Sequence, residues 1–155
     1  PPIYRVSKVW QHFLTFNHLK MEIKLNFDGY WRDSVKNGVP NESGIYLVYR
    51  CKHNVSEGSV ALKELLYIGE SKEMRDRLAK HERYYDWEAH LNRGEELCYA
   101  YTKVGKTERV LGEAALINYH KPPENTEYVD EFPYGSTTVL SSGTCRFIES
   151  PITVY

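Results

Sequence analysis

The sequence has no long apolar run and no excess of charge of either sign. No stretch of its 155 residues approaches the ~18 consecutive apolar residues that a membrane-spanning helix needs, so no membrane contact is expected. The formal net charge is -1, whereas nucleic-acid-binding proteins usually carry a basic excess. Residues 122–155 hold five acidic residues and one basic residue, which leaves a net charge of +3 on the remainder. This distribution allows a modest basic surface on the remainder of the chain.

Cysteine is also scarce. Cys51, Cys98 and Cys145 follow one another at intervals of 47 residues, so no pair has the short spacing of zinc ligands. An odd number of cysteines argues against a disulfide framework. We therefore expect three unpaired thiols and a reducing, cytoplasmic location.

Hydrophobic periodicity predicts three strands in the middle of the chain. Residues 44–50 alternate with the two-residue period of a strand. Residues 65–68 form a short apolar run that ends at Gly69, and residues 95–104 alternate again. These three segments are the predicted sheet.

Two helices are predicted beside these strands. Ser71 is a suitable N-cap for a helix over residues 72–82, on which Arg77 and His81 share a face because they are four residues apart. A second helix is predicted over residues 106–120, where Pro122 and Pro123 stop it.

The flanking segments give weaker patterns. Residues 3–20 contain a helical apolar stripe, which serves either packing or a partner helix, and residues 21–27 alternate as an amphipathic strand. Residues 51–64 read as a long polar loop, either a plain surface loop or one that contacts DNA. Residues 126–155 predict turns with one or two short strands.

Two tripeptides resemble a known family. Gly44-Ile45-Tyr46 and Tyr67-Ile68-Gly69 match literally the two signatures of the GIY-YIG nucleases. Four further elements follow in the family order, namely Arg77 ten residues after Tyr67, His81 four residues later, the helical segment 112–117 with Glu113, and the proline-asparagine turn 122–125 with Asn125. The resemblance covers residues 43–125, about half of the chain.

The resemblance implies a fold of the α/β class (α+β type). It consists of a small central antiparallel sheet of about three strands flanked by helices, with extra N- and C-terminal decorations. Residues 1–155 then form a single domain with the nuclease core at 43–125. Residues 1–42 are an N-terminal extension of a helix plus a strand, and residues 126–155 are a C-terminal extension.

The same resemblance implies a metal-dependent endonuclease that hydrolyses phosphodiester bonds of DNA. Glu113 would hold the metal, and a single carboxylate with water ligands suits Mg²⁺, with Mn²⁺ as a substitute. Arg77 would contact the scissile phosphate through its planar, permanently charged guanidinium. One of the signature tyrosines would help to activate the attacking water; we favour Tyr46, and Tyr67 stays open.

Four more residues complete the predicted site. Histidine ordinarily titrates near neutrality, so we expect His81 to be suited to accepting a proton or binding phosphate. Asn125 would order the turn behind the site through its amide. Lys72 and Lys80 are candidate contacts to DNA phosphates, while the residues alone favour ordinary solvated lysines on a helix.

A non-catalytic alternative stays open. A nucleic-acid- or protein-binding module on the same scaffold would account for the near-zero net charge and the aromatic first twenty residues. Among the catalytic uses of the scaffold, a compact nuclease with extensions on both sides resembles the restriction enzymes most, which also implies a homodimer as one expected state.

Overall fold

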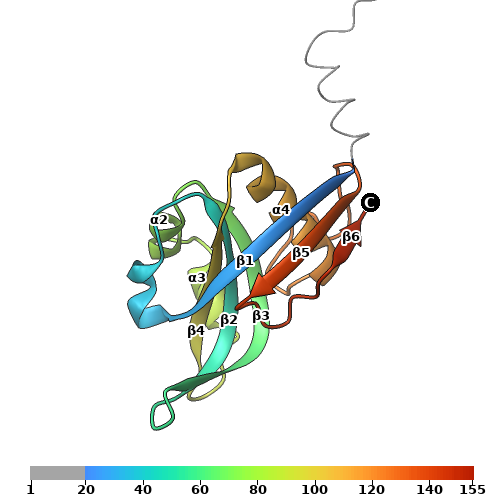
Figure 1. Ribbon diagram of the computed structural model, residues 1–155. Helices are drawn as coiled ribbons and strands as arrows, with labels where there is room; N and C mark the ends of the chain where they lie inside the picture. Colours follow the sequence, from blue (N-terminus) through green and yellow to red (C-terminus); the bar gives the residue numbers. More distant parts are fainter. Residues whose placement is uncertain (1–19) are drawn as a thin grey trace, which may run out of the picture.

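The computed structural model describes residues 20–155 (Figure 1). The apolar stripe predicted over residues 3–20 lies, except for Lys20, outside the described residues. In chain order the elements are β1 (Met21–Arg32), the 3-10 helix η1 (Asp33–Gly38), β2 (Gly44–Asn54), β3 (Ser59–Ser71), α2 (Met74–Ala79), α3 (Tyr84–Glu88), β4 (Glu96–Lys103), α4 (Lys106–His120), β5 (Thr137–Gly143) and β6 (Ile152–Val154).

The strands form one curled, mixed sheet of six strands in the order β3-β2-β4-β1-β5-β6. β1 and β5 run parallel, whereas the other neighbours are antiparallel. The prediction of a small antiparallel sheet of about three strands flanked by helices, with terminal decorations, is therefore wrong. The supposed decorations supply β1, β5 and β6, which extend the same sheet (Figure 1).

The predicted loop over residues 51–64 is a β-hairpin. β2 continues to Asn54 and β3 begins at Ser59, so that His53 pairs with Val60 across the hairpin. Gly58 has a φ of 61° in the connecting turn, a conformation that glycine adopts without steric cost. Half-exposed strands carry polar residues on one face, which is why this segment reads as a loop in the sequence.

β1 is longer than its amphipathic pattern indicates. It runs from Met21 through Asp28 to Arg32, with a shift in its register against β4 between Gly29 and Trp31. Asp28-Gly29 is typical of a turn, but the backbone of this segment pairs with β4 from Asp28 to Arg32, so the strand continues.

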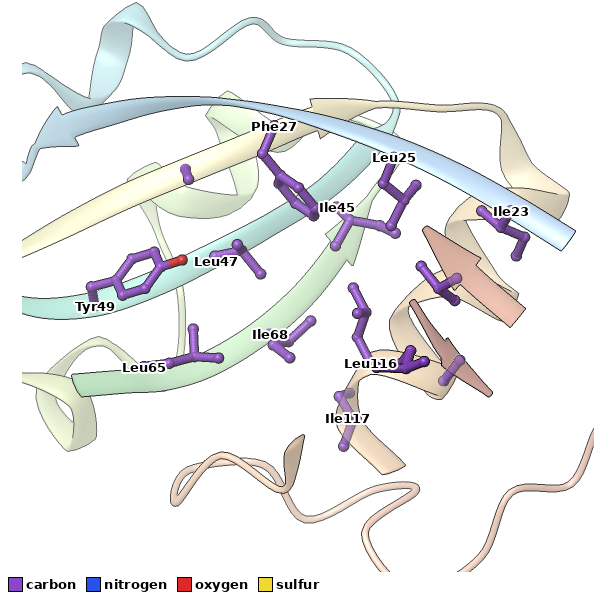
Figure 2. Close-up of a cluster of buried hydrophobic side chains, with 14 of the residues drawn as sticks. Ile23, Leu25, Phe27, Ile45, Leu47, Tyr49, Leu65, Ile68, Leu116 and Ile117 are labelled. Atoms are coloured by element: carbon purple, nitrogen blue, oxygen red, sulfur yellow. The ribbon is translucent and has the colours of Figure 1, made fainter. Parts of the chain in front are cut away.

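Two apolar clusters cover the two faces of the central strands. One lies between the sheet and α4 and is drawn in Figure 2; its members include Ile23, Leu25, Phe27, Ile45, Leu47, Leu65, Ile68, Leu116 and Ile117. The other lies beneath α2 and α3 and includes Tyr46, Val48, Leu66, Met74, Leu78, Trp87 and Tyr99. Because both faces are covered, all residues from Gly44 to Tyr49 are buried.

The helices differ in how well their predicted bounds hold. α4 spans residues 106–120 as predicted. α2 is shorter than predicted and ends at Ala79, so His81 lies beyond it, while Ser71 Oγ accepts a hydrogen bond from the backbone N–H of Glu73 at 3.0 Å. Within residues 20–155, no helix has the length and apolar character needed to cross a bilayer.

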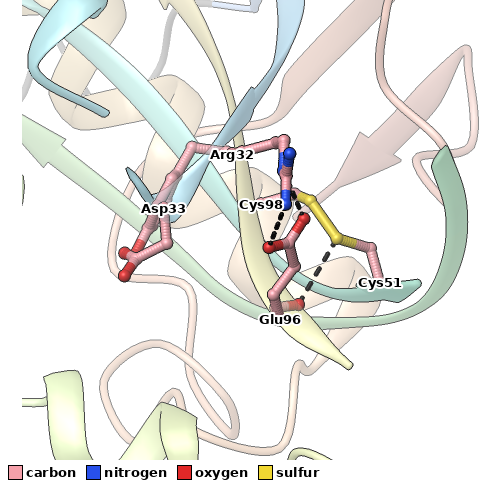
Figure 3. Close-up of a disulfide and its surroundings, with 6 residues drawn as sticks. Arg32, Asp33, Cys51, Glu96 and Cys98 are labelled. Atoms are coloured by element: carbon pink, nitrogen blue, oxygen red, sulfur yellow. Dashed lines mark hydrogen bonds and ion pairs between the residues drawn. A yellow bond between two sulfur atoms is a disulfide. The ribbon is translucent and has the colours of Figure 1, made fainter. Parts of the chain in front are cut away.

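Cys51 on β2 and Cys98 on β4 form a disulfide (Figure 3), while Cys145 is free. The expectation of three unpaired thiols is therefore wrong for this pair. The register places Cys51 opposite Glu96 and Cys98 opposite Tyr49, so the two cysteines are diagonal neighbours on one face. The separation of 47 residues in the sequence does not indicate that the two cysteines are close in space.

Candidate active site

A cleft of about 290 Å³ opens where β3, α4 and the segment after α4 meet. Five of the six predicted catalytic residues line it, and the complete lining consists of Tyr46, Tyr67, Ile68, Glu70, Arg77, Glu82, Arg83, Glu113, Ile117, Glu124, Asn125, Thr126 and Glu127. The sixth, His81, is buried and contacts Tyr46. Segments more than 70 residues apart in the chain thus converge on one polar cavity.

Both signature glycines have a steric reason in this fold. A Cβ atom on Gly44 would lie 2.1 Å from the carbonyl oxygen of Thr102 on β4. A Cβ atom on Gly69 would lie 2.3 Å from Cζ and 2.4 Å from the hydroxyl of Tyr46. Gly69 on β3 therefore provides the space in which the Tyr46 phenol lies.

The hydroxyl of Tyr46 is hydrogen-bonded to Nε2 of His81 at 2.9 Å. The other ring nitrogen, Nδ1, accepts the backbone N–H of Arg83 at 3.1 Å and therefore carries no proton. Burial, followed by the charge of Arg77, lowers the pKa of His81 to about 4, so the ring is neutral near pH 7. The single ring proton is then on Nε2, and His81 donates to the oxygen of Tyr46.

The two signature tyrosines stack with their ring centroids 6.3 Å apart. Burial raises the pKa of Tyr67 to about 12, with a further increase from Glu113 and an opposing effect of Arg77. Burial also raises the pKa of Tyr46 well above 10, and Arg77 opposes this shift as well. In the protein alone both phenols are therefore protonated at neutral pH.

Arg77 forms a two-pronged ion pair with Glu82. Its Nη2 lies 2.6 Å from Oε1, and its Nη1 pairs with the other carboxylate oxygen. This contact lowers the pKa of Glu82 to about 2. A guanidinium that holds a carboxylate in this way presents the same two donors with which arginine binds phosphate.

Glu113 projects from α4 into the cleft. Burial raises the pKa of its carboxyl to about 8, and the nearby carboxylates of Glu70 and Glu127 add to the shift. Arg109 and a backbone hydrogen bond from Glu70 act in the opposite direction. Glu113 is thus an oxygen donor whose ionised form needs additional positive charge.

A buried arginine connects the cleft wall to the sheet. Arg109 on α4 pairs through Nε with Glu70 at the end of β3, and its Nη1 donates to Ser43 Oγ at 2.8 Å. Ser43 Oγ in turn donates to the backbone oxygen of Val104 at 2.6 Å. These contacts fix α4, and with it Glu113, against the strands.

Asn125 binds the backbone of the second signature strand. Its Oδ1 accepts the N–H of Ile68 and its Nδ2 donates to the carbonyl of Ile68, both at 2.9 Å. β3 is an edge strand, and Asn125 satisfies backbone groups that have no further strand beside them. The amide therefore holds β3, and Tyr67 next to Ile68, in place.

The remaining predicted residues lie apart from the cleft lining. Lys72 and Lys80 flank α2 with exposed side chains and do not line the cavity. Sequence reasoning missed Glu82 and Glu127, for which no motif gives a signal. Glu70 directly follows the second tripeptide, so its position beside the site could have been inferred from that strand.

Comparison of the chain with protein-family models, curated proteins and solved structures finds no match. The resemblance to the GIY-YIG nucleases therefore rests on the sequence motifs alone.

Proposed function

We propose that this protein is a Mg²⁺-dependent DNA endonuclease of the GIY-YIG type, with its active site in the cleft around Glu113. The observation that carries the proposal is that Tyr46, Arg77 and Glu113, which come from β2, α2 and α4, line one cavity. Hydrolysis of a phosphodiester needs an activated water, stabilised charge on the phosphate and a departing 3′ oxygen. In the cleft, the tyrosines are suited to activating water, and Arg77 is suited to stabilising the charge on the phosphate.

The residues present fit a hydrated divalent cation. Glu113 would hold it through a carboxylate oxygen, and the cavity of about 290 Å³ leaves space for water molecules as further ligands. A bound Mg²⁺ would supply positive charge that favours ionised Glu113 and Tyr46 and stabilises the charge on the phosphate. The residues that line the cleft offer carboxylate oxygens and include no cysteine or histidine, which favours Mg²⁺ or Mn²⁺ over Zn²⁺.

Tyr46 is the better candidate for proton transfer from the attacking water. The hydrogen bond from His81 Nε2 and the charge of Arg77 both stabilise the phenolate of Tyr46. Tyr67 contacts His81 only through its ring. Since Nδ1 of His81 is already an acceptor for Arg83, His81 acts as a donor that positions Tyr46 rather than as the base.

Arg77 would bind the phosphate that is cleaved. Its two donors hold Glu82, whose side chain is 63% exposed, so the carboxylate can leave toward solvent. A phosphate entering the cleft would replace it and accept the same two hydrogen bonds. Glu82 thus acts as a competitor that keeps Arg77 oriented before DNA binds.

The test is cleavage of DNA by the purified full chain. Supercoiled plasmid and branched DNA are incubated with Mg²⁺ or Mn²⁺, with EDTA as the matched control, and the ends are sequenced and analysed for 5′-phosphate. Metal-dependent ends with 5′-phosphate and 3′-hydroxyl groups support the proposal. Intact DNA in every metal and salt, together with a stable complex, would favour the binding-module alternative instead.

Other properties belong to the same proposal. A restriction-type role and a homodimer that cuts both strands rest on the family resemblance. A cytoplasmic location is part of it too, although the disulfide between Cys51 and Cys98 removes the argument from unpaired cysteines.

A further inference from the structure

The disulfide lies among other groups that bind metals. Cys51 and Cys98 are completely buried on adjacent interior strands, and Glu96 lies directly opposite Cys51 on β4 (Figure 3). One ligand atom from each of these three residues lies within 4.8 Å of the other two. They share a face because Glu96 and Cys98 are two residues apart and Cys51 pairs with Glu96.

These separations suit a tetrahedral ion. Zinc binds thiolate sulfur at about 2.3 Å, which places two sulfur ligands roughly 3.8 Å apart. The two cysteines lie with Cα atoms 6.3 Å apart on paired strands, so small side-chain rotations separate the sulfurs by this amount once the bond between them is broken. Placement on two hydrogen-bonded strands also preorganises the ligands.

The charges of the cluster balance around a divalent cation. Arg32 pairs with both oxygens of Glu96 at 2.7 and 3.1 Å and offsets its charge. Two thiolates offset the charge of Zn²⁺, so the ion together with its ligands and Arg32 would be neutral. A carboxylate has enough lone pairs to accept from Arg32 and bind the ion at once.

A nitrogen ligand lies on the same face. His53 follows Cys51 by two residues on β2, and its Nδ1 is buried with no hydrogen-bond partner among the described residues. His53 and Cys98 line one cavity of about 230 Å³, which leaves space for the imidazole ring to move. A buried ring nitrogen without a partner is costly, and coordination would satisfy it.

We propose that reduction of the disulfide creates a Zn²⁺ site held by Cys51, Cys98 and Glu96, with His53 as the fourth ligand. A dithiol reductant supplies two electrons and two protons, is itself oxidised to a disulfide, and leaves two cysteine thiols. Both thiols lose their protons to solvent when zinc binds. The disulfide and the zinc site are therefore mutually exclusive states of one cluster.

This site is independent of the proposed nuclease function. Cys51 is five residues from Tyr46 along β2, which corresponds to about 17 Å in an extended strand. Tyr46 and Cys51 also belong to the clusters on opposite faces of the sheet. Zinc binding can thus be present or absent whether or not the protein cleaves DNA.

The test uses the full chain in two forms, one oxidised and one reduced with a small dithiol that is then removed without oxygen. Each is titrated with Zn²⁺ and, in parallel, with Co²⁺. The reduced form should bind one equivalent and give the sulfur-to-cobalt charge-transfer band together with the intense visible bands of tetrahedral Co²⁺. The oxidised form should give neither kind of band and should bind one equivalent fewer than the reduced form.

Substitutions identify the ligands. Cys51→Ser and Cys98→Ser should each weaken Zn²⁺ binding at least about 100-fold, and Glu96→Gln and His53→Ala about 10-fold. Cys145→Ser is the matched control and should bind as the parent does. A reduced parent without stoichiometric Zn²⁺, or a Cys145→Ser variant that loses binding equally, would overturn the proposal. The comparison of reduced and oxidised parent decides the matter if a cysteine variant does not fold.

Discussion

Nε2 of His81 lies 2.9 Å from the hydroxyl oxygen of Tyr46, and the backbone N–H of Arg83 occupies the opposite nitrogen of the ring. Because Nδ1 must accept, the neutral ring can only donate to Tyr46. A buried histidine of lowered pKa, about 4, therefore has one fixed direction of hydrogen bonding across the neutral pH range.

Replacement of this donor should reduce cleavage. We expect His81→Phe to lower kcat about 100-fold, because the phenolate of Tyr46 loses its stabilising hydrogen bond. His81→Gln, whose amide can donate, should recover part of the rate. Single-turnover cleavage and thermal unfolding of both variants provide the measurement; equal rates in His81→Phe and the parent would exclude this role.

Removal of the charge that occupies Arg77 should strengthen DNA binding. In Glu82→Gln the guanidinium no longer holds a carboxylate, so a phosphate displaces a weaker partner, and we expect KM for DNA to fall about 3- to 10-fold. Glu57→Gln, in the exposed β2–β3 turn, changes the net charge by the same amount but lies far from the cleft. It should therefore leave KM nearly unaltered. A similar decrease of KM in both variants would attribute the effect to overall charge.

Gly69, the glycine of the second tripeptide, should be essential for the position of the Tyr46 side chain. In Gly69→Ala the new methyl group would collide with the Tyr46 ring, since a Cβ lies 2.3 Å from Cζ. We expect a rate loss of about 100-fold or more from the displaced hydroxyl. Gly105→Ala is the control, because no atom lies within 4 Å of its Cβ. Unchanged cleavage by Gly69→Ala would mean that the position of Tyr46 does not matter.

The parts of the fold that the sequence predicts are those with a local cause. The bounds of α4, the approximate extent of β4 and the positions of β2 and β3, although not their full lengths, follow from periodicity and from proline. The six-stranded sheet does not, since Met21 on β1 pairs with Thr137 on β5, across more than 100 residues. Local pattern cannot specify such pairing, and this explains the wrong three-strand prediction.

The candidate site likewise contains residues that the sequence predicts and contacts that it does not. Literal tripeptides and regular spacing point to Tyr46, Arg77 and Glu113, which the structure brings into one cleft. The pairing of Arg77 with Glu82 depends on how the chain bends after α2, and no motif indicates it. The disulfide likewise depends on strand register rather than on cysteine spacing.

The raised pKa of Glu113 predicts a pH dependence of stability without metal. The pKa of Glu113 in the folded protein, about 8, exceeds the ordinary value of 4.5. Its contribution to the stability of the folded state is therefore fully present below pH 4.5 and is lost progressively as the pH rises to 8 and through it. Glu113→Gln has no carboxyl to ionise and therefore lacks this loss. As the pH rises from 5 to 9 in EDTA, its free energy of unfolding should increase relative to that of the parent by up to roughly 3 kcal/mol, after allowance for solvent screening. Chemical denaturation of the parent, Glu113→Gln and Glu57→Gln measures it. A difference that does not vary with pH would contradict the burial of this carboxyl, and excess Mg²⁺ should diminish the difference.

The most direct test of the central claim is metal-dependent plasmid cleavage by Glu113→Gln beside the parent and Glu57→Gln, at equal concentration and with DNA binding measured on the same samples. The account predicts that the parent and Glu57→Gln cut DNA in Mg²⁺, whereas Glu113→Gln folds and binds DNA but cuts at least about 1,000-fold more slowly. Cleavage by Glu113→Gln at the parental rate would contradict the proposal that this cleft is the active site.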